Sequence, residues 1–262
     1  MENIDAIAVT YAPGLLGSLL VGVEFAKTMS FVYKKPLIAV NHIAGHIYAN
    51  NLEKPMQFPL LALVVSGGHT DLILMKGDYQ FEHIGGTLDD AIGECYDKVA
   101  RVIGLGYPGG PKVEKAALEG EHTYDLPTPM NDDSFNMSFS GLKSNIINLV
   151  HNEKQRGNEV RNNDLARSFQ DVAVDQLCRK TELAIKKYGV KNMIIAGGVS
   201  ANKYLRQEIK KVTDKYGVDL SVPSFVYCTD NAAMIGAAAY PLYLKGEFAD
   251  LSLNATSSDE LY

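Results

Sequence analysis

Two histidines, His42 and His46, stand four residues apart in the segment NHIAGHIYAN. On a helix this spacing places both imidazoles on one face, where their ring nitrogens could share one transition metal ion. The same pair also occurs in helices where both histidines are structural. A zinc peptidase of the H-E-x-x-H kind needs a glutamate directly after the first histidine, but Ile43 stands there. The sequence therefore argues against that class of peptidase.

A carboxylate far along the chain is the candidate third ligand. Asp230 lies in the segment CTDN, directly before an alanine- and glycine-rich stretch at 232–244 that predicts a helix. As an N-cap residue, Asp230 would only begin that helix. As a metal ligand, it would complete a set of two histidines and one carboxylate, which leaves coordination positions open for a substrate.

Three pairs of adjacent glycines, at 67–68, 109–110 and 197–198, stand where predicted elements end. The first pair separates two apolar strands at 59–65 and 71–75, which predicts a hairpin rather than a Walker or Rossmann turn. Backbone N–H groups at the tip of that hairpin could bind a phosphate, and a plain hairpin turn is the alternative.

The other two glycine pairs lie in different local patterns. The run GLGYPGGP at 104–111 is so rich in glycine and proline that it predicts a loop of fixed shape that contacts a ligand. The third pair follows a strand at 192–196 and precedes a helix containing Arg206 and Lys210. A strand that ends in paired glycines at a helix start brings a flat ligand, such as a nucleoside, close to the backbone.

The remaining pattern alternates strands and helices, which predicts a layered α/β fold. Residues 151–163 are polar and charged, so they are expected to be the least ordered part of the chain. Further strands are expected at 4–11, 36–40 and 221–227, and helices at about 14–29, 42–50, 87–103, from 140 onward and at 165–188.

Charged residues stand at the predicted starts of two of these helices. Thr87 is expected to cap the first of them, with Asp89 and Asp90 favourably placed in its first turn. Ser140 is expected to cap the second, where Lys143 is unfavourably placed for the helix dipole. Lys143 therefore either faces an anion or is solvated.

The composition limits the class of protein. The chain has 262 residues and a net charge of -6, which argues against a free-standing nucleic-acid binder, although a local basic patch could serve. Neither a membrane span nor a signal peptide is expected. The three cysteines are widely separated, which indicates a reducing compartment and a cytoplasmic location; they are Cys95, Cys178 and Cys228.

Six segments taken together resemble the universal tRNA adenosine threonylcarbamoyltransferase family, which includes bacterial TsaD and its archaeal and eukaryotic counterpart. They are NHIAGH, VSGGHT, DDAIGE with YDKVAR and LGYPGGP, FSGLKS, GGVSAN with LR, and CTDNAAMIG. The resemblance implies the α/β actin/Hsp70/sugar-kinase (ASKHA) fold, in which two lobes enclose a nucleotide cleft. It also implies an acyltransferase that moves a threonylcarbamoyl group from threonylcarbamoyl-AMP to N6 of adenosine 37 in tRNAs reading ANN codons.

The resemblance further implies the roles of individual residues. The metal ligands would be His42, His46 and Asp230, holding one divalent ion, Fe²⁺ or Zn²⁺. The substrate and its phosphate would be lined by Val65, Ser66, Gly67, Gly68 and His69. The nucleotide part, or ATP or ADP in the cleft, would be held by Asp97, Gly110, Glu114 and Asn202. Glu114 departs from the family pattern, in which an aspartate is frequent.

Partners follow from the same resemblance: tRNA and, in bacteria, a dimerising TsaB-like paralogue and a small TsaE-like ATPase, with no membrane. Because the chain is acidic, we expect it to bind tRNA weakly without those partners. The basic residues that are candidates for tRNA contact are Lys34, Lys35, Lys143, Arg206, Lys210 and Lys211.

The resemblance also predicts the domain organisation. Residues 1–57 would form the remainder of the first lobe with the metal-binding helix, joined by C-terminal helices at about 231–262. Residues 58–230 would form the second lobe with the nucleotide-binding loops. Family members begin with strands that carry a T-S-C-D-E-T-like phosphate loop, and none precedes Met1.

We therefore expect an incomplete first lobe, self-association through it, and impaired transfer by this chain alone. The alternative function is a non-catalytic, nucleotide-binding scaffold paralogue of the same complex. An intact set of two histidines and one aspartate is unnecessary for a scaffold, so the sequence favours the enzyme.

Overall fold

The computed structural model describes residues 1–258 and 261. By contacts the chain divides into two compact units. Unit 1 comprises residues 1–58, 75–82 and 223–262, and unit 2 comprises residues 59–74 and 83–222. Residues 75–82 and 223–230, which the sequence-based division assigns to the second lobe, cluster with unit 1.

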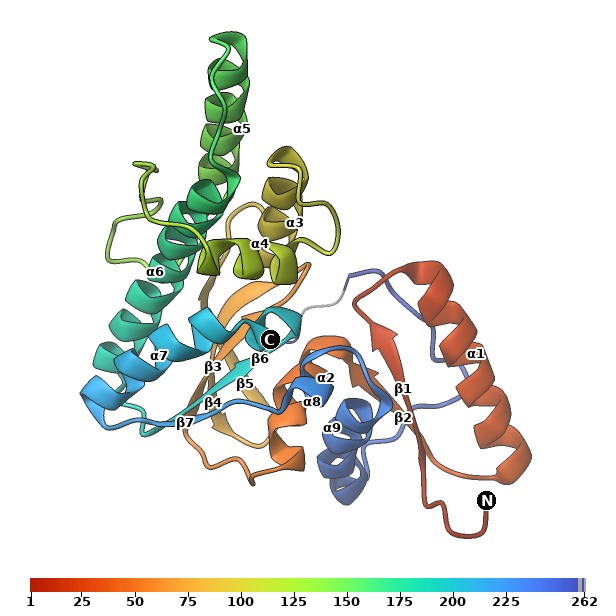
Figure 1. The fold of residues 1–262 in the computed structure, drawn as a ribbon. Coiled ribbons are helices and arrows are strands. Elements are labelled where there is room, and N and C mark those ends of the chain that lie inside the picture. Colours follow the sequence, from red (N-terminus) through yellow and green to blue (C-terminus); the bar gives the residue numbers. More distant parts are fainter. Residues whose placement is uncertain (259–260, 262) are drawn as a thin grey trace. The chain divides into compact units, whose positions relative to one another are not determined.

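Unit 1 is built on two parallel strands, β1 (Ile7–Ala12) and β2 (Leu37–Asn41). They are joined by α1 (Leu16–Tyr33), which runs four residues beyond the predicted end and stops where Lys34 adopts a left-handed conformation. On the other side of these strands lies α9 (Ala232–Lys245), as Figure 1 shows.

The strand β2 leads directly into α2 (His42–Tyr48), which continues as the short 3₁₀ helix η1 (Ala49–Leu52). Asn41 begins α2, because its side-chain Oδ1 accepts hydrogen bonds from the backbone N–H groups of Ile43 (2.8 Å) and Ala44 (3.4 Å). Asn41 satisfies two of the backbone donors that a helix N-terminus leaves unpaired, so the short helix has a defined start.

Unit 2 is organised around a sheet with the strand order β5-β4-β3-β6-β7. Its central strand β3 is buried along its whole length and pairs in parallel with β6. The consecutive strands β3 and β4 are neighbours, which confirms the predicted hairpin. The strands are β3 (Leu60–Val65), β4 (Thr70–Gly77), β5 (Gln80–Gly86), β6 (Asn192–Ala196) and β7 (Asp219–Ser221).

Five helices of unit 2 cover this sheet and form its core with it, and Figure 1 shows the long pair α5 and α6 in green. The helix α6 contacts β3, α4 and α7. The five are α3 (Ile92–Val102), α4 (Gly109–Leu118), α5 (Ser140–Gln155), α6 (Asn162–Tyr188) and α7 (Lys203–Tyr216). None of the helices in the described part of the chain is long and apolar enough to cross a membrane.

One local prediction is wrong, and another is correct only in part. A strand is expected at 221–227, but β7 ends at Ser221 because Pro223 cannot donate to a strand ladder. Phe225–Cys228 instead forms the short helix α8. The run expected to be a loop at 104–111 is a loop up to Pro108, and its last three residues open α4. Within the stretch expected to be the least ordered, residues 151–155 belong to α5, residues 162–163 belong to α6, and residues 156–161 connect the two helices.

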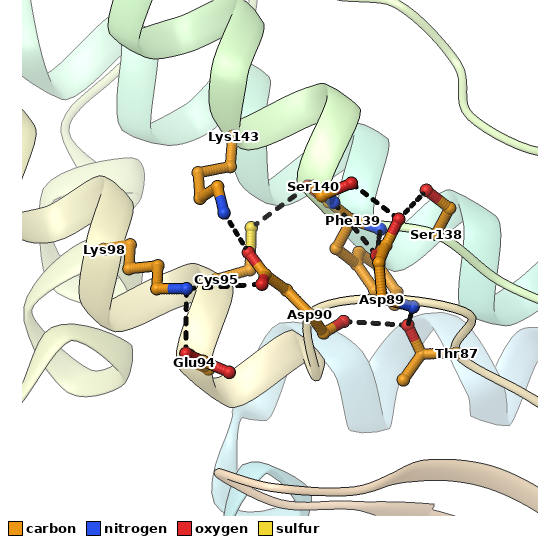
Figure 2. A network of polar contacts seen from close by, with 10 residues as sticks. All are labelled: Thr87, Asp89, Asp90, Glu94, Cys95, Lys98, Ser138, Phe139, Ser140 and Lys143. Carbon is orange, nitrogen blue, oxygen red and sulfur yellow. Dashed lines mark hydrogen bonds and ion pairs between the residues drawn. The ribbon is translucent and has the colours of Figure 1, made fainter.

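The predicted cap at Thr87 is also wrong, because α3 begins only at Ile92. Asp89 instead lies in the preceding loop, where its carboxylate faces the start of α5 (Figure 2). It accepts hydrogen bonds from the backbone N–H groups of Phe139 (2.8 Å) and Ser140 (3.1 Å) and from the hydroxyls of Ser138 and Ser140. Asp89 therefore caps α5, a helix about 50 residues later in the chain.

The neighbouring Asp90 supplies the anion that Lys143 lacks in its own helix. The ammonium groups of Lys143 and Lys98 both contact the Asp90 carboxylate, the second at 3.2 Å, and Lys98 also pairs with Glu94 at 2.8 Å (Figure 2). Of the two alternatives for Lys143, an anion partner is therefore the one observed. We call the contacts of Asp89 and Asp90 with α5 the α5 anchor.

Acid is expected to release the α5 anchor. Burial raises the pKa of Asp89, but hydrogen bonds from Ser138, Ser140 and Phe139 outweigh it and lower the pKa to about 2. Because this value lies below the ordinary 3.8, the stabilisation is fully present above pH 3.8 and is lost as the pH falls towards 2. Hydrogen exchange of the Phe139 and Ser140 amides should accelerate over this range relative to intrinsic exchange.

An Asp89→Asn variant should show fast exchange at both amides at every pH, because the amide side chain is a weaker acceptor. The matched control is Asp133→Asn, at an exposed aspartate of the same unit. Equal exchange profiles for the wild type and Asp89→Asn would contradict the role of Asp89.

Candidate metal centre and nucleotide-binding loops

The side chains of His42, His46 and Asp230 converge within unit 1. Their donor atoms all lie within 4.8 Å of one another. The Oδ1 atom of Asp230 is 3.4 Å from Nε2 of His42 and 3.3 Å from Nε2 of His46. Two ligands that each bind one ion at about 2.1 Å are about 3.4 Å apart at a tetrahedral angle, so the two distances to Asp230 fit a shared ion.

Local structure places each of these side chains. His42 and His46 lie one helical turn apart on the same face of α2, and their ring centroids are 4.7 Å apart. Asn231, not Asp230, is the N-cap of α9, because its Oδ1 accepts a hydrogen bond from the Met234 N–H at 2.9 Å. The structural alternative for Asp230 is therefore wrong, and its carboxylate faces the histidines.

The three side chains differ in exposure: His46 is 3% exposed, His42 24% and Asp230 78%. The hydrogen bond with His46, together with the charges of both histidines, lowers the pKa of Asp230 despite its partial burial. Asp230 therefore stays ionised, as a metal ligand must be. Nitrogen, nitrogen and carboxylate oxygen form a donor set that suits iron or zinc.

The residues predicted to line the substrate form the tight turn between β3 and β4. Ser66 and His69 are joined by two hydrogen bonds, from the Ser66 N–H to the His69 carbonyl (2.8 Å) and from the His69 N–H to Ser66 Oγ (3.0 Å). Val65 is buried, whereas Gly67 and Gly68 are exposed. At both glycines, no described atom beyond the adjacent residues of the chain lies within 4 Å of the position that a Cβ would take.

The helix α3 brings the glycine turns together. A Cβ on Gly93 of this helix would lie 2.5 Å from the Ser66 carbonyl oxygen, and one on Gly109 would lie 2.5 Å from the Asp97 Cα. A Cβ on Gly197, whose φ is 90°, would lie 2.4 Å from the Val65 carbonyl oxygen. The short 3₁₀ helix that follows, η2 (Gly198–Ala201), contacts α3. The three glycine pairs thus belong to one neighbourhood of unit 2.

Asp97, Glu114 and Asn202 each connect two elements of that neighbourhood. Asp97 Oδ1 accepts a hydrogen bond from the Gly109 N–H (2.7 Å), and Glu114 Oε1 accepts one from the Lys203 N–H (2.6 Å). Asn202 caps α7 through the Leu205 N–H (2.8 Å) and donates to Gln170 Oε1 (3.2 Å). These contacts hold α3, α4, α6 and α7 together around the glycine turns.

Sequence reasoning missed Gly93, Gln170 and the cap Asn41. A glycine inside a predicted helix costs about 1 kcal/mol relative to alanine, so Gly93 carried a detectable signal of close packing. Asn41 carried one too, as an asparagine directly before a helix. Gln170 lies within α6 and carried no local signal.

Comparison with solved structures concerns the fold alone. HypF in its phosphate- and nucleotide-bound form has a TM-score of 0.64 and 15% identity, over 86% of this chain and 38% of HypF. HypF of T. kodakarensis has a TM-score of 0.66 and 17% identity, over 97% of this chain and 42% of that protein. These likenesses confirm the predicted α/β fold of the ASKHA class.

Comparison with known sequences gives the family. The model of tRNA N6-adenosine threonylcarbamoyltransferase, TsaD, matches residues 1–237. A protein of that name from Staphylococcus carnosus (strain TM300) is 56% identical over 259 residues, which cover 98% of this chain and 76% of the relative. Its counterpart in Staphylococcus aureus (strain MRSA252) is 55% identical over 262 residues, which cover 100% and 77%. The chain belongs to the tRNA N6-adenosine threonylcarbamoyltransferase family.

Proposed function

We propose that the chain takes a threonylcarbamoyl group from threonylcarbamoyl-AMP and transfers it to N6 of adenosine 37 in tRNAs reading ANN codons. Threonylcarbamoyl transfer to tRNA adenosine is the activity of the family to which the chain belongs. The observation that carries the proposal is the convergence of His42, His46 and Asp230, with all donor atoms within 4.8 Å. A scaffold paralogue would not need this geometry.

We assign one Fe²⁺ or Zn²⁺ ion to these three side chains. A metal of this kind, when bound, supplies a Lewis acid that can orient and polarise the carbamoyl carbonyl. The protein's own contribution is the arrangement of two imidazoles and one ionised carboxylate, which leaves coordination positions for substrate. The transfer needs no covalent protein nucleophile, because AMP is already a leaving group on the donor.

The phosphate of the donor is proposed to bind at the turn Val65–His69. Gly67 and Gly68 are exposed residues with open space beside their Cα atoms, so a ligand can approach their backbone, and backbone N–H donors balance phosphate charge. The nucleotide part, or ATP or ADP, is proposed to lie against Gly110, where the space beside Cα is open in the same way, with Asp97, Glu114 and Asn202 nearby.

The proposed partners are tRNA, a dimerising TsaB-like paralogue and a small TsaE-like ATPase, in the cytoplasm. We place the paralogue on the outer face of α1, whose apolar side chains are unusually exposed for a helix. Val21 and Phe25, one helical turn apart, are 74% and 67% exposed, and Phe31 is 71% exposed. Large apolar side chains exposed together on one helix support an association site there. The net charge of -6 predicts that tRNA binding depends on these partners.

The direct test is reconstitution with defined components. The purified chain is mixed with paralogue, ATPase, tRNA and threonylcarbamoyl-AMP, and the modified nucleoside is measured by mass spectrometry after tRNA digestion. We expect the modified adenosine to appear only when this chain and its partners are all present. Formation of the complex with no modified nucleoside, while a homologous enzyme modifies the same tRNA, would favour the scaffold function.

A further inference from the structure

The tip of the β4–β5 hairpin, residues 75–82, contacts both helices that carry the metal centre. Tyr48, the last residue of α2, donates a hydrogen bond from its hydroxyl to the Asp78 carboxylate and accepts one from the Tyr79 N–H at 3.0 Å. The rings of Tyr48 and Tyr79 are stacked, with centroids 5.0 Å apart and planes inclined by 26°. The tip is therefore bound to the end of α2.

The same tip is bound to α9. The hydroxyl of Tyr79 donates a hydrogen bond of 2.5 Å to the carbonyl oxygen of Ala238, in the middle of that helix. The Lys245 ammonium donates to the Asp78 carbonyl at 3.2 Å and lies 5.5 Å from the centre of the Tyr79 ring. Burial raises the pKa of both Tyr48 and Tyr79, so each hydroxyl keeps its proton and remains a donor.

Tyr79 occupies an unfavourable backbone conformation. Its φ is 57°, in the left-handed region that glycine and asparagine adopt readily but that costs other residues about 1–2 kcal/mol. A hairpin turn could place glycine there without this cost. The hydrogen bond and ring contacts of the Tyr79 side chain compensate for the strain. The turn itself does not require a tyrosine, so the side chain serves to bind the hairpin to α2 and α9.

The contacts between α2 and α9 run from the metal centre to the hairpin tip. At one end Asp230, just before α9, faces His42 and His46. In the middle, Ile235 of α9 packs against Gly45 of α2. A Cβ on Gly45 would lie only 2.8 Å from Cδ1 of Ile235, so the close approach depends on glycine. At the other end Tyr79 connects the two helices through hydrogen bonds.

We propose that Tyr79 is a positioning residue for the metal centre. By connecting Tyr48 on α2 to Ala238 on α9, it fixes the two helices relative to each other, and so fixes the distance from Asp230 to both imidazoles. Groups that hydrogen-bond directly to metal ligands commonly change metal affinity by about 10–100-fold. Tyr79 acts through the two helices, so we expect an effect at the lower end of this range. This inference rests on the proposed metal role of the three ligands.

The test is the variant Tyr79→Phe, which removes one oxygen atom from the full-length chain and keeps the ring. Metal affinity is measured by titrating metal-free protein with Zn²⁺ against a chelator of known affinity, and ligand geometry by the visible absorption of the Co²⁺ form. We expect about 10-fold weaker Zn²⁺ binding and a changed Co²⁺ spectrum. The control Tyr240→Phe, at a 60% exposed tyrosine of α9, should match the wild type in both.

A second variant separates positioning from general destabilisation. Tyr79→Gly relaxes the backbone at this turn but removes every side-chain contact to α9, so metal affinity should fall at least as far as in Tyr79→Phe. The proposal is overturned if Tyr79→Phe binds Zn²⁺ like the wild type with an unchanged Co²⁺ spectrum. If the wild type itself binds no Zn²⁺, the metal assignment under the proposed function fails, and this inference fails with it.

Discussion

Replacing His46 with alanine is expected to remove tight metal binding from this chain while the rest of unit 1 stays folded. His46 is one of three protein donors that meet within 4.8 Å, and its Nε2 is 3.3 Å from Asp230 Oδ1. Loss of a ligand should exceed the effect of losing a supporting residue, so we expect more than about 100-fold weaker binding. His42→Ala and Asp230→Asn should behave in the same direction.

The measurement is metal content by elemental analysis after exchange into metal-free buffer, with circular dichroism to confirm the fold. The matched control is His151→Ala, which removes an exposed histidine on α5 in unit 2. The same variants should lose tRNA modification in the reconstituted assay. Full metal occupancy in His46→Ala would contradict the assignment of the centre.

Two adjacent glycines are expected to respond in opposite ways to alanine. A Cβ on Gly109 would lie 2.5 Å from the Cα of Asp97 and 2.6 Å from the Tyr96 carbonyl oxygen, both parts of the backbone of α3. Gly109→Ala should therefore force α3 and α4 apart and destabilise the protein by about 1–3 kcal/mol. At Gly110 no described atom lies within 4 Å of the corresponding position, so Gly110→Ala should fold normally.

Gly110→Ala is instead expected to weaken nucleotide binding. Alanine is the better helix former by about 1 kcal/mol, so this change in α4 should keep or raise the melting temperature. Its methyl group would occupy the open space where we place the nucleotide, and AMP affinity should drop about 10-fold or more. Thermal unfolding and calorimetric titration with AMP separate the two effects. Unchanged AMP binding in Gly110→Ala would remove Gly110 from the proposed nucleotide site.

Much of the fold follows from local patterns in the sequence. The apolar runs at 59–65 and 192–196 lie at β3 and β6, and the amphipathic stretch at 165–188 lies within α6. The pair His42 and His46 lies on one face of a helix, as its spacing predicts. These features depend on residues close together in the chain, for which hydrophobic periodicity is informative.

The tertiary structure decided which polar groups meet. Asp89 and Asp90 have the composition of a local helix cap, but Asp89 accepts hydrogen bonds from the start of α5, and Asp90 pairs with Lys143 of α5 as well as with Lys98 of α3. Asn231 caps α9, and this leaves Asp230 to face the histidines. The two roles would be exchanged if the helix began one residue earlier. Local patterns rarely resolve such a difference.

The sequence by itself therefore determined the family, the principal elements and the residue types of the candidate metal centre. Only the tertiary structure decided the contact of Asp230 with both histidines, the approach of α3 to the glycine turns, and the binding of Tyr79 to α9. The physical reason is that helix and strand formation is governed by neighbours within a few residues. The hydrogen bond between Tyr79 and Ala238, by contrast, forms only once the intervening chain has packed.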